Sequence, residues 1–191
     1  MNTPSYIEKI NCAIVSASHP PAPDPDLFKP TSVMALFLFN REPALLFIQK
    51  ADREGYAWRN QMAFPGGHVE KTDASARHAA FRELYEETGI VSDNVQYIGS
   101  LGHFQTLKNR DIQAFTGIWN RKDDIVFDTQ EISRTLEIPF DTLWQTHRKR
   151  GYTGHRPSVM ELIYPYKDVV IWGVTAQIVH HLLEVVGNIL E

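Results

Sequence analysis

The chain has 191 residues, of which 43% are hydrophobic and 22% are charged, and its formal net charge is −4 at pH 7. This length predicts one domain, or one domain with an extension, and the composition is that of an ordinary globular protein. The negative net charge argues against a general nucleic-acid binder, which is usually basic. No stretch approaches the roughly 18 consecutive apolar residues of a membrane-spanning helix, so no membrane partner is expected.

Two features of the N-terminal region favour a cytoplasmic protein. The first ten residues, MNTPSYIEKI, contain no apolar run of the kind found in secretory signals. Cys12 is the single cysteine, so no disulfide can form within the chain. We expect Cys12 to be buried as a small hydrophobic residue and not to act as a nucleophile.

The first thirty residues are expected to be an extension of the main domain. Apolar residues at helical spacing predict a short helix over residues 4–16. The segment SHPPAPDPDLFKP follows, and its five prolines in thirteen residues predict an extended connector. We therefore predict an N-terminal extension over residues 1–30 and a main domain over residues 31–191.

The main domain alternates strands and helices. Two nearly continuous apolar runs, 33–39 and 44–49, flank the polar break NREP and predict a hairpin whose strands are buried on both faces. Residues 53–73 are expected to be a loop. The later elements are expected to be strands at 95–106, 111–120 and about 134–138, a short helix after Pro139, two short strands, and a final helix at about 173–190. This order predicts an α/β (α+β) fold in which a mixed β-sheet is sandwiched between α-helices.

Residues 74–88, ASARHAAFRELYEET, are predicted to form a helix with three glutamates on one face. Asp73 is the candidate N-cap and Gly89 the candidate stop. Glu83, Glu86 and Glu87 occupy positions i, i+3 and i+4, where like charges repel one another. For an isolated pattern of this kind, a solvated helix face is the common explanation. The functional explanation is a hard cation such as Mg²⁺, which binds carboxylate oxygens.

The sequence FPGG, residues 64–67, lies upstream of this helix. Two consecutive glycines let the backbone approach a ligand closely, and their carbonyl oxygens can complete the shell of a cation. Arg82 can pair with a neighbouring carboxylate and fix its rotamer. A glycine loop followed by a helix with three carboxylates therefore favours a functional site.

The segment GGHVEKTDASARHAAFRELYEETGI resembles the Nudix box, G-x5-E-x7-R-E-U-x-E-E-x-G-U, in which U is an aliphatic residue. Its second half matches at Arg82, Glu83, Leu84, Glu86, Glu87, Gly89 and Ile90. In its first half, Asp73 replaces the glutamate and one residue is added. An added residue of this kind is familiar from the coenzyme A pyrophosphatase branch of the family.

Two further stretches resemble that branch. NQMAFPGG looks like the end of its upstream signature, and YPYKDVVIWGVTAQIV resembles its C-terminal stretch. The resemblance covers about residues 32–186. The segment LFIQKADREGYAWRNQ departs from the upstream signature, because it lacks the usual serine and has Trp58 where histidine is usual.

The resemblance implies the Nudix fold and metal-dependent hydrolysis of a nucleoside diphosphate linked to another group, with Mg²⁺ or Mn²⁺ as the cofactor. Within this branch, the implied substrate is coenzyme A or acyl-CoA, which would be cleaved to 3′,5′-ADP and (acyl-)4′-phosphopantetheine. One alternative is a broader hydrolase of ADP-ribose, dinucleotides or nucleoside triphosphates. Another is a sensor that binds a nucleotide without cleaving it. Family members are often dimers, so a homodimer is a further expectation.

The resemblance also implies roles for individual residues. The expected metal ligands are Gly67, Glu83, Glu86 and Glu87. We expect Arg82 to orient its neighbours, and either Glu86 or the later Glu131 to act as the general base. Asp73 is either only an N-cap or an outer contact to the metal.

The candidates for substrate contacts come from a different part of the chain. Lys50, Arg53 and Arg59 are candidates to bind a phosphate, although surface solubility explains each of them equally well. The aromatic candidates to stack on a base are Tyr56, Trp58 and Phe104, and packing in the core is the common alternative for such residues.

Overall fold

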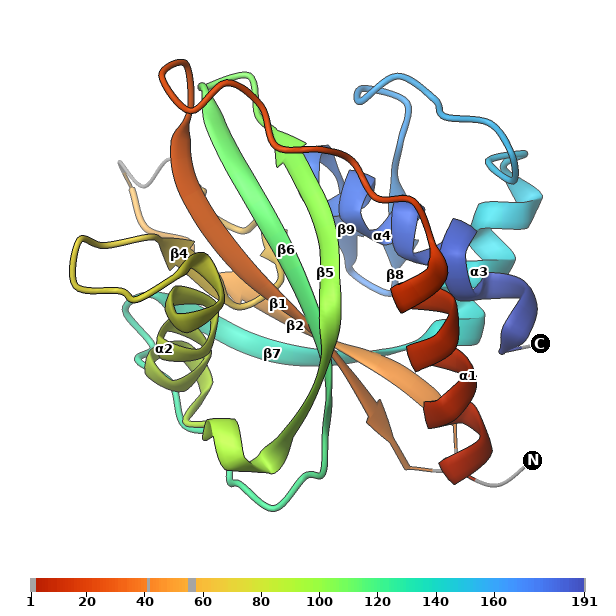
Figure 1. Cartoon of the computed structure of the whole chain (residues 1–191), viewed down its shortest axis with the longest axis horizontal. Helices are drawn as coiled ribbons and strands as arrows, with labels where there is room; N and C mark the ends of the chain where they lie inside the picture. The colour runs from red at the N-terminus through yellow and green to blue at the C-terminus, as the bar shows by residue number, and fades with distance from the viewer. Residues whose placement is uncertain (1–2, 41, 55–57, 191) are drawn as a thin grey trace.

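The computed structural model describes residues 3–40, 42–54 and 58–190. A twisted sheet forms its centre, with α2 on one side and α1, α3 and α4 on the other (Figure 1). The helices are α1 (Thr3–Ser16), α2 (Ala76–Thr88), α3 (Phe140–Lys149) and α4 (Gly173–Val186), with short 3-10 turns η1 (Ser92–Asn94) and η2 (Gly187–Ile189). None of the helices in these ranges has the length and apolar character needed to cross a membrane. The predicted sandwich of a sheet between helices is confirmed.

The sheet is mixed, as expected. In the described residues its strands are β1 (Lys29–Phe39), β2 (Pro43–Lys50), β3 (Met62–Ala63), β4 (Gly66–His68), β5 (Val95–Gln105), β6 (Arg110–Trp119) and β7 (Ile132–Pro139), and a separate hairpin joins β8 (Tyr164–Tyr166) to β9 (Val169–Ile171). The pair β1–β6 is parallel and the other pairs are antiparallel. The predicted β1–β2 hairpin is confirmed, with Phe37 opposite Leu45.

One edge of β1 serves two partners, and this positions the glycine loop. The C-terminal end of β1 pairs with β2, whereas its N-terminal part pairs with β4, so that Ser32 lies opposite Gly67 and Val33 opposite Gly66. Gly66 has a φ of +156°, and a Cβ atom there would lie 2.2 Å from the carbonyl oxygen of Ser32. The expectation that 53–73 is a loop is therefore wrong at β3 and β4, because short pairings with neighbouring strands override the local turn signals.

Alternate residues of β1 contribute to two separate cores, as the continuous apolar run predicts. Met34, Leu36 and Leu38 pack against α2, while Ala35 and Phe37 face the core on the other side of the sheet. This second core lies beneath α1, α3 and α4. Strand β1 is consequently buried on both faces.

Helix α1 packs on the second core through Ile10 and Ile14, both fully buried. Cys12 is exposed, so its predicted burial is wrong. The reason is helical geometry, since a residue two positions from Ile10 and Ile14 points to the opposite side of the helix. The division between residues 1–30 and 31–191 stays a prediction, although α1 shares a core with the domain that follows it.

Candidate active site

Helix α2 begins and ends at well-defined caps. The Ser75 hydroxyl accepts a hydrogen bond from the His78 amide at 3.1 Å, so the prediction that Asp73 is the N-cap is wrong. At the other end, Gly89 has a φ of 75° and its amide donates to the Tyr85 carbonyl at 2.8 Å, which confirms the predicted stop.

The three glutamates of α2 differ in exposure. Glu86 is 54% exposed, Glu83 is 16% exposed and Glu87 only 7%. Ala80 and Leu84 of the same helix are fully buried against the sheet. A solvated helix face therefore does not explain Glu83 and Glu87, because burying a charge without a partner costs several kcal/mol, on the order of the whole stability of a domain.

Arg82 is the centre of a hydrogen-bonded network that holds two of these glutamates. Its Nη1 donates to Glu83 Oε1 and Glu86 Oε2, each at 2.9 Å. Its Nε and Nη2 donate to the two oxygens of Asp73 at 3.1 and 3.0 Å, and Nη2 also reaches the His68 carbonyl at 3.0 Å. Nη1 thus holds the two glutamates, while Nε and Nη2 together bind Asp73.

Asp73 is the anchor of Arg82. Its side chain is 1% exposed, and it also accepts hydrogen bonds from the Glu70 amide at 2.8 Å and from His78 Nδ1 at 2.9 Å. The Arg82 guanidinium holds the pKa of the Asp73 carboxyl well below its usual range, and Asp73 in turn raises the pKa of Arg82. Both groups therefore stay charged at neutral pH.

Glu87 is held by a second cation. Lys50 Nζ forms an ion pair with Glu87 Oε1, and the Gly66 amide donates to Oε2 at 2.8 Å. Burial raises the pKa of Glu87, and Lys50 opposes this rise. Burial also raises the pKa of Glu83, opposed by Arg82. Lys50 thus lies within the carboxylate cluster, and its predicted contact with a substrate phosphate stays a prediction.

Gly67 lies directly against Glu83. A Cβ atom at Gly67 would come within 2.4 Å of the carboxyl atoms of Glu83, so any other residue here would displace the Glu83 carboxylate. Glu83 and Glu86 already converge on one cationic nitrogen, Arg82 Nη1. No group of three His, Cys, Asp or Glu residues converges as a metal site in the described part of the chain. The donors are hard oxygens on a close-approach glycine loop, a set that fits Mg²⁺ or Mn²⁺.

Glu131 comes to this cluster from the loop before β7. Its carbonyl accepts a hydrogen bond from the Ala51 amide at 2.9 Å, next to Lys50. Its charge acts on Glu87 and contributes to the raised pKa of that residue. Its side chain is exposed and makes no ion pair within the described residues. The fold thus brings the two candidates for the general base, Glu86 and Glu131, to the same region.

The other substrate-contact candidates lie in different environments. Arg59 is exposed and pairs with Asp52 at 2.8 Å, and Arg53 is exposed as well. Neither makes an ion pair with the carboxylates of α2 within residues 3–40, 42–54 and 58–190. Phe104 is buried in the core beside His181, so it is not available to stack on a base. Tyr56 lies outside the described residues.

Arg110 is a neighbour of the site that the sequence did not single out. Its Nη1 lies 2.8 Å from Nδ1 and 2.7 Å from Nε2 of His68, and its guanidinium carbon lies 5.4 Å from the ring centre of Trp58. Burial, followed by the charges of Arg110 and Lys29, lowers the pKa of His68. No local pattern marks Arg110, because it reaches the site through the pairing of β6 with β1.

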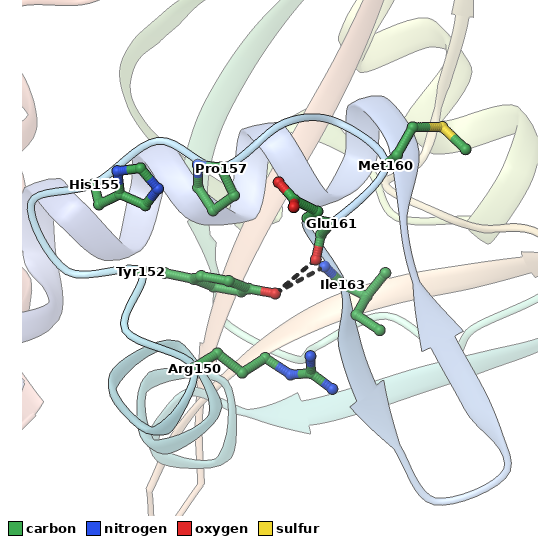
Figure 2. A pocket seen from close by; sticks show the side chains of 7 residues that line it. All are labelled: Arg150, Tyr152, His155, Pro157, Met160, Glu161 and Ile163. Atoms are coloured by element: carbon green, nitrogen blue, oxygen red, sulfur yellow. Dashed lines mark hydrogen bonds between the residues drawn. The ribbon is translucent and has the colours of Figure 1, made fainter.

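A separate cavity of about 550 Å³ lies in the segment between α3 and β8 (Figure 2). Tyr152 lines this cavity. Its hydroxyl donates a hydrogen bond to the Glu161 carbonyl at 2.7 Å and lies 3.5 Å from the Ile163 amide. This cavity belongs to the side of the sheet covered by α3 and α4, whereas the carboxylates belong to α2 on the other side (Figure 1). It is therefore not part of the candidate active site.

A sequence profile described as the NUDIX domain matches residues 29–162, which is more than half of the chain. The chain belongs to the NUDIX domain family. Similar proteins include the uncharacterized Nudix hydrolase NudL of Pectobacterium atrosepticum, 29% identical over 154 residues that cover 79% of each chain. NudL of Yersinia pestis is 28% identical over 159 residues, covering 82% of this chain and 79% of its own.

Solved structures support the Nudix fold. A MutT/nudix family protein from Enterococcus faecalis superposes with a TM-score of 0.58 at 16% identity, covering 95% of this chain and 74% of that chain. Ap4A hydrolase from C. elegans gives a TM-score of 0.50 at 16% identity, covering 58% of this chain and 80% of its own. The chain is thus an enzyme of the Nudix hydrolase type, a pyrophosphatase, and such hydrolases generally use divalent metal ions.

Proposed function

We propose that this Nudix hydrolase cleaves the pyrophosphate of coenzyme A or acyl-CoA, releasing 3′,5′-ADP and (acyl-)4′-phosphopantetheine. The observation that carries the proposal is the meeting of the two stretches that resemble the coenzyme A branch. Strand β3, which ends just before FPGG, lies against β9, which precedes α4. The two stretches are far apart in the chain, yet they contact each other in the fold. We infer that both shape the same substrate site.

The residues of the carboxylate cluster have distinct tasks in this proposal. Glu83, Glu86, Glu87 and the Gly67 carbonyl would hold Mg²⁺ or Mn²⁺. When bound, the ion offsets negative charge on the phosphate oxygens and makes water a better nucleophile. Arg82 keeps Glu83 and Glu86 oriented, because Asp73 fixes its guanidinium from behind. Lys50 offsets the charge of Glu87 until the substrate and ion arrive.

Glu131 is the proposed general base. A base must accept a proton from the attacking water, and a carboxylate tied to a guanidinium is a poor acceptor. Glu86 is tied to Arg82 in this way, whereas Glu131 has no ion-pair partner within the described residues and is near enough for its charge to act on Glu87. Water that gives its proton to Glu131 attacks one phosphorus, and the bond from that phosphorus to the bridging oxygen breaks.

A broader hydrolase of ADP-ribose, dinucleotides or nucleoside triphosphates is the second candidate. Its support is the altered upstream segment, in which the usual serine is missing and Trp58 replaces histidine. A homodimer and a cytoplasmic location remain expectations from the sequence. So does the view that the partner is a small nucleotide-type molecule and not a nucleic acid.

The decisive experiment compares coenzyme A, ADP-ribose and diadenosine tetraphosphate with Mg²⁺ or Mn²⁺ and identifies the products by mass. We expect 3′,5′-ADP and 4′-phosphopantetheine from coenzyme A, and a loss of about 10²–10³-fold in kcat for Glu131→Gln. Cleavage of the other compounds alone would reject the coenzyme A proposal and favour the broader hydrolase. Tight nucleotide binding without any turnover would favour the sensor.

A further inference from the structure

A second cavity, of about 790 Å³, is lined in part by Arg110, whose guanidinium contacts His68 of β4. Three segments line it: the end of the N-terminal connector at 25–30, Trp58, and the β5–β6 turn at 108–110. Figure 1 shows the connector passing the ends of β5 and β6 before it enters β1. Most of these residues lie outside the stretches that resemble the coenzyme A branch.

Three cationic side chains line this cavity. Lys29 and Arg110 are register partners in the parallel β1–β6 pair, so their side chains belong to neighbouring strands at the same level. Lys108 joins them from the turn. Asp26 is the one carboxylate of the lining, and within the described residues none of the three cations makes an ion pair. The cavity therefore carries an excess of positive charge.

His68 links this cavity to the carboxylate cluster of α2. This residue follows Gly67 on β4, its carbonyl accepts a hydrogen bond from Arg82, and its ring contacts Arg110. On β1, Lys29 lies three residues before Ser32, the partner of Gly67. Three residues of an extended strand span about 10 Å, a distance that one nucleoside can bridge.

The composition of the cavity identifies the chemistry of its ligand. A metal ion held by the carboxylates would already offset charge on the pyrophosphate, so the three cations of this cavity call for a second anion. Arg110 lies over the ring of Trp58, an arrangement that suits a phosphate beside an aromatic base, since guanidinium groups bind phosphates and tryptophan stacks on bases. A substrate with one pyrophosphate and no further phosphate would leave these cations without a counter-charge.

We propose that this cavity binds the phosphomonoester-bearing nucleoside end of the substrate, with Arg110 and Lys29 holding the phosphate and Trp58 beside the base. The inference deepens the proposed function and rests on it for the position of the pyrophosphate. It makes Arg110 and Lys29 determinants of specificity and leaves the chemical step to α2 and Glu131.

The kinetic test uses coenzyme A and 3′-dephospho-coenzyme A, which differ only in this phosphate. For Arg110→Ala and Lys29→Ala, we expect KM for coenzyme A to rise about 10-fold or more, with kcat changed less than about 3-fold and KM for the dephospho compound nearly unchanged. Equal effects on both substrates, or no effect on either, would overturn the inference. Arg110→Gln is a second variant that retains more of the side chain, and melting temperatures establish that each variant folds.

Arg121→Ala is the matched control. Arg121 lies 5.6 Å over the ring of Trp119, which reproduces the stacking of Arg110 on Trp58. It follows β6, whose far end at Trp119 lies about 30 Å from Arg110 along the strand. We expect this variant to retain the preference for coenzyme A.

A binding experiment separates the failure of this inference from the failure of the proposed function. Calorimetry compares adenosine 3′,5′-bisphosphate with adenosine 5′-monophosphate, and neither requires turnover. If the bisphosphate binds more tightly and Arg110→Ala removes the difference, the inference stands even if coenzyme A is not cleaved. If coenzyme A is cleaved but the two nucleotides bind equally, the inference is wrong and the proposed function stands.

Discussion

The two sides of the sheet each bury polar groups, but in different ways. On the α2 side, charged groups pair with charged groups, and Arg82 and Lys50 hold three glutamates and Asp73. On the α4 side, His147 is 0% exposed and uses both ring nitrogens, one with the Tyr164 hydroxyl at 2.9 Å and one with Glu184 at 2.8 Å. The α2 side thus contains a cluster of paired charges, whereas the α4 side contains a buried histidine whose two ring nitrogens are both hydrogen-bonded.

This difference suggests that the charged cluster on the α2 side serves catalysis and that the His147 network on the α4 side serves stability. The carboxylates of α2 are graded from buried to exposed, and in the proposed function a metal ion would take over the contacts that Arg82 and Lys50 now make. The His147 network joins α3, β8 and α4, and Glu184 also binds the Gly154 amide at 2.9 Å, which fastens the segment after α3. Changes on the α2 side should therefore affect mainly catalysis, and changes at His147 mainly stability.

Glu86→Gln gives the largest expected effect. It removes a charge from the metal-binding face but keeps the shape of the side chain, so we expect kcat to fall about 10³-fold, equivalent to about 4 kcal/mol of barrier. The melting temperature should change little, because Glu86 is half exposed. Steady-state kinetics measure the loss. Glu137→Gln is the control, since Glu137 is also partly exposed and pairs with an arginine at 2.8 Å. Equal activity of the two variants would contradict the assignment of Glu86.

His147→Ala tests the other side of the comparison. It leaves a cavity and removes the partner of Tyr164 and Glu184, so we expect the free energy of unfolding to fall by about 3 kcal/mol. Chemical denaturation measures this value, and kcat of the folded enzyme should stay within about twofold of the wild type. His155→Ala, at an exposed histidine of the neighbouring loop, should be nearly neutral. If His147→Ala lowered kcat strongly without lowering stability, the assignment of His147 to folding would be wrong.

Asp73→Asn lies between the two cases. Asparagine cannot match both nitrogens that Arg82 presents, so we expect a loss of about 2 kcal/mol of stability. Because Arg82 then holds Glu83 and Glu86 less firmly, activity should fall about 10–100-fold. Denaturation and kinetics measured together test this double effect. Asp168→Asn removes an exposed ion pair with Arg134 and should change neither quantity noticeably.

Acid pH gives the smallest expected effect and acts on the α4 side. Burial, with the nearby His19, lowers the pKa of His181 to about 4. The unfolded chain takes up this proton below about pH 6.5, so it binds more protons than the folded state, and stability falls as the pH drops from about 6.5 to 4. We expect His181 to contribute about 1 kcal/mol to this fall by pH 5, since its ring is partly exposed. Melting curves at pH 7 and 5 test it, and an unchanged slope in His181→Phe would contradict it.

Local patterns predicted most of the elements and the core of the candidate site. The β1–β2 hairpin, β5, β6, α2 and its stop at Gly89 all follow from apolar periodicity and turn residues, which act over a few positions. The spacing of Glu83, Glu86 and Glu87 placed them on one face beside the buried face of α2. That spacing depends only on the helical repeat.

Contacts between distant segments could not be predicted in this way. The sequence suggested Asp73 as a cap, yet it anchors Arg82 because the segment before α2 folds back along the helix. Lys50 was a candidate to bind a substrate phosphate or to be a surface lysine, and its pairing with Glu87 depends on how β2 and α2 pack together. Helical geometry alone could have corrected Cys12, since its helix buries Ile10 and Ile14 on the opposite face.

The sequence by itself determined the residue types of the candidate site: a glycine loop and a helix with three carboxylates and an arginine among them, all within one short segment. The tertiary structure decided which cations hold those carboxylates, how Glu131 comes near enough for its charge to act on Glu87, and how Lys29 and Arg110 meet at one cavity. The physical reason is that residue type and helical repeat act locally, whereas strand pairing joins positions whose distance along the chain carries no signal. The parallel pairing of β1 with β6 is the clearest case, because it alone brings Arg110 beside Lys29.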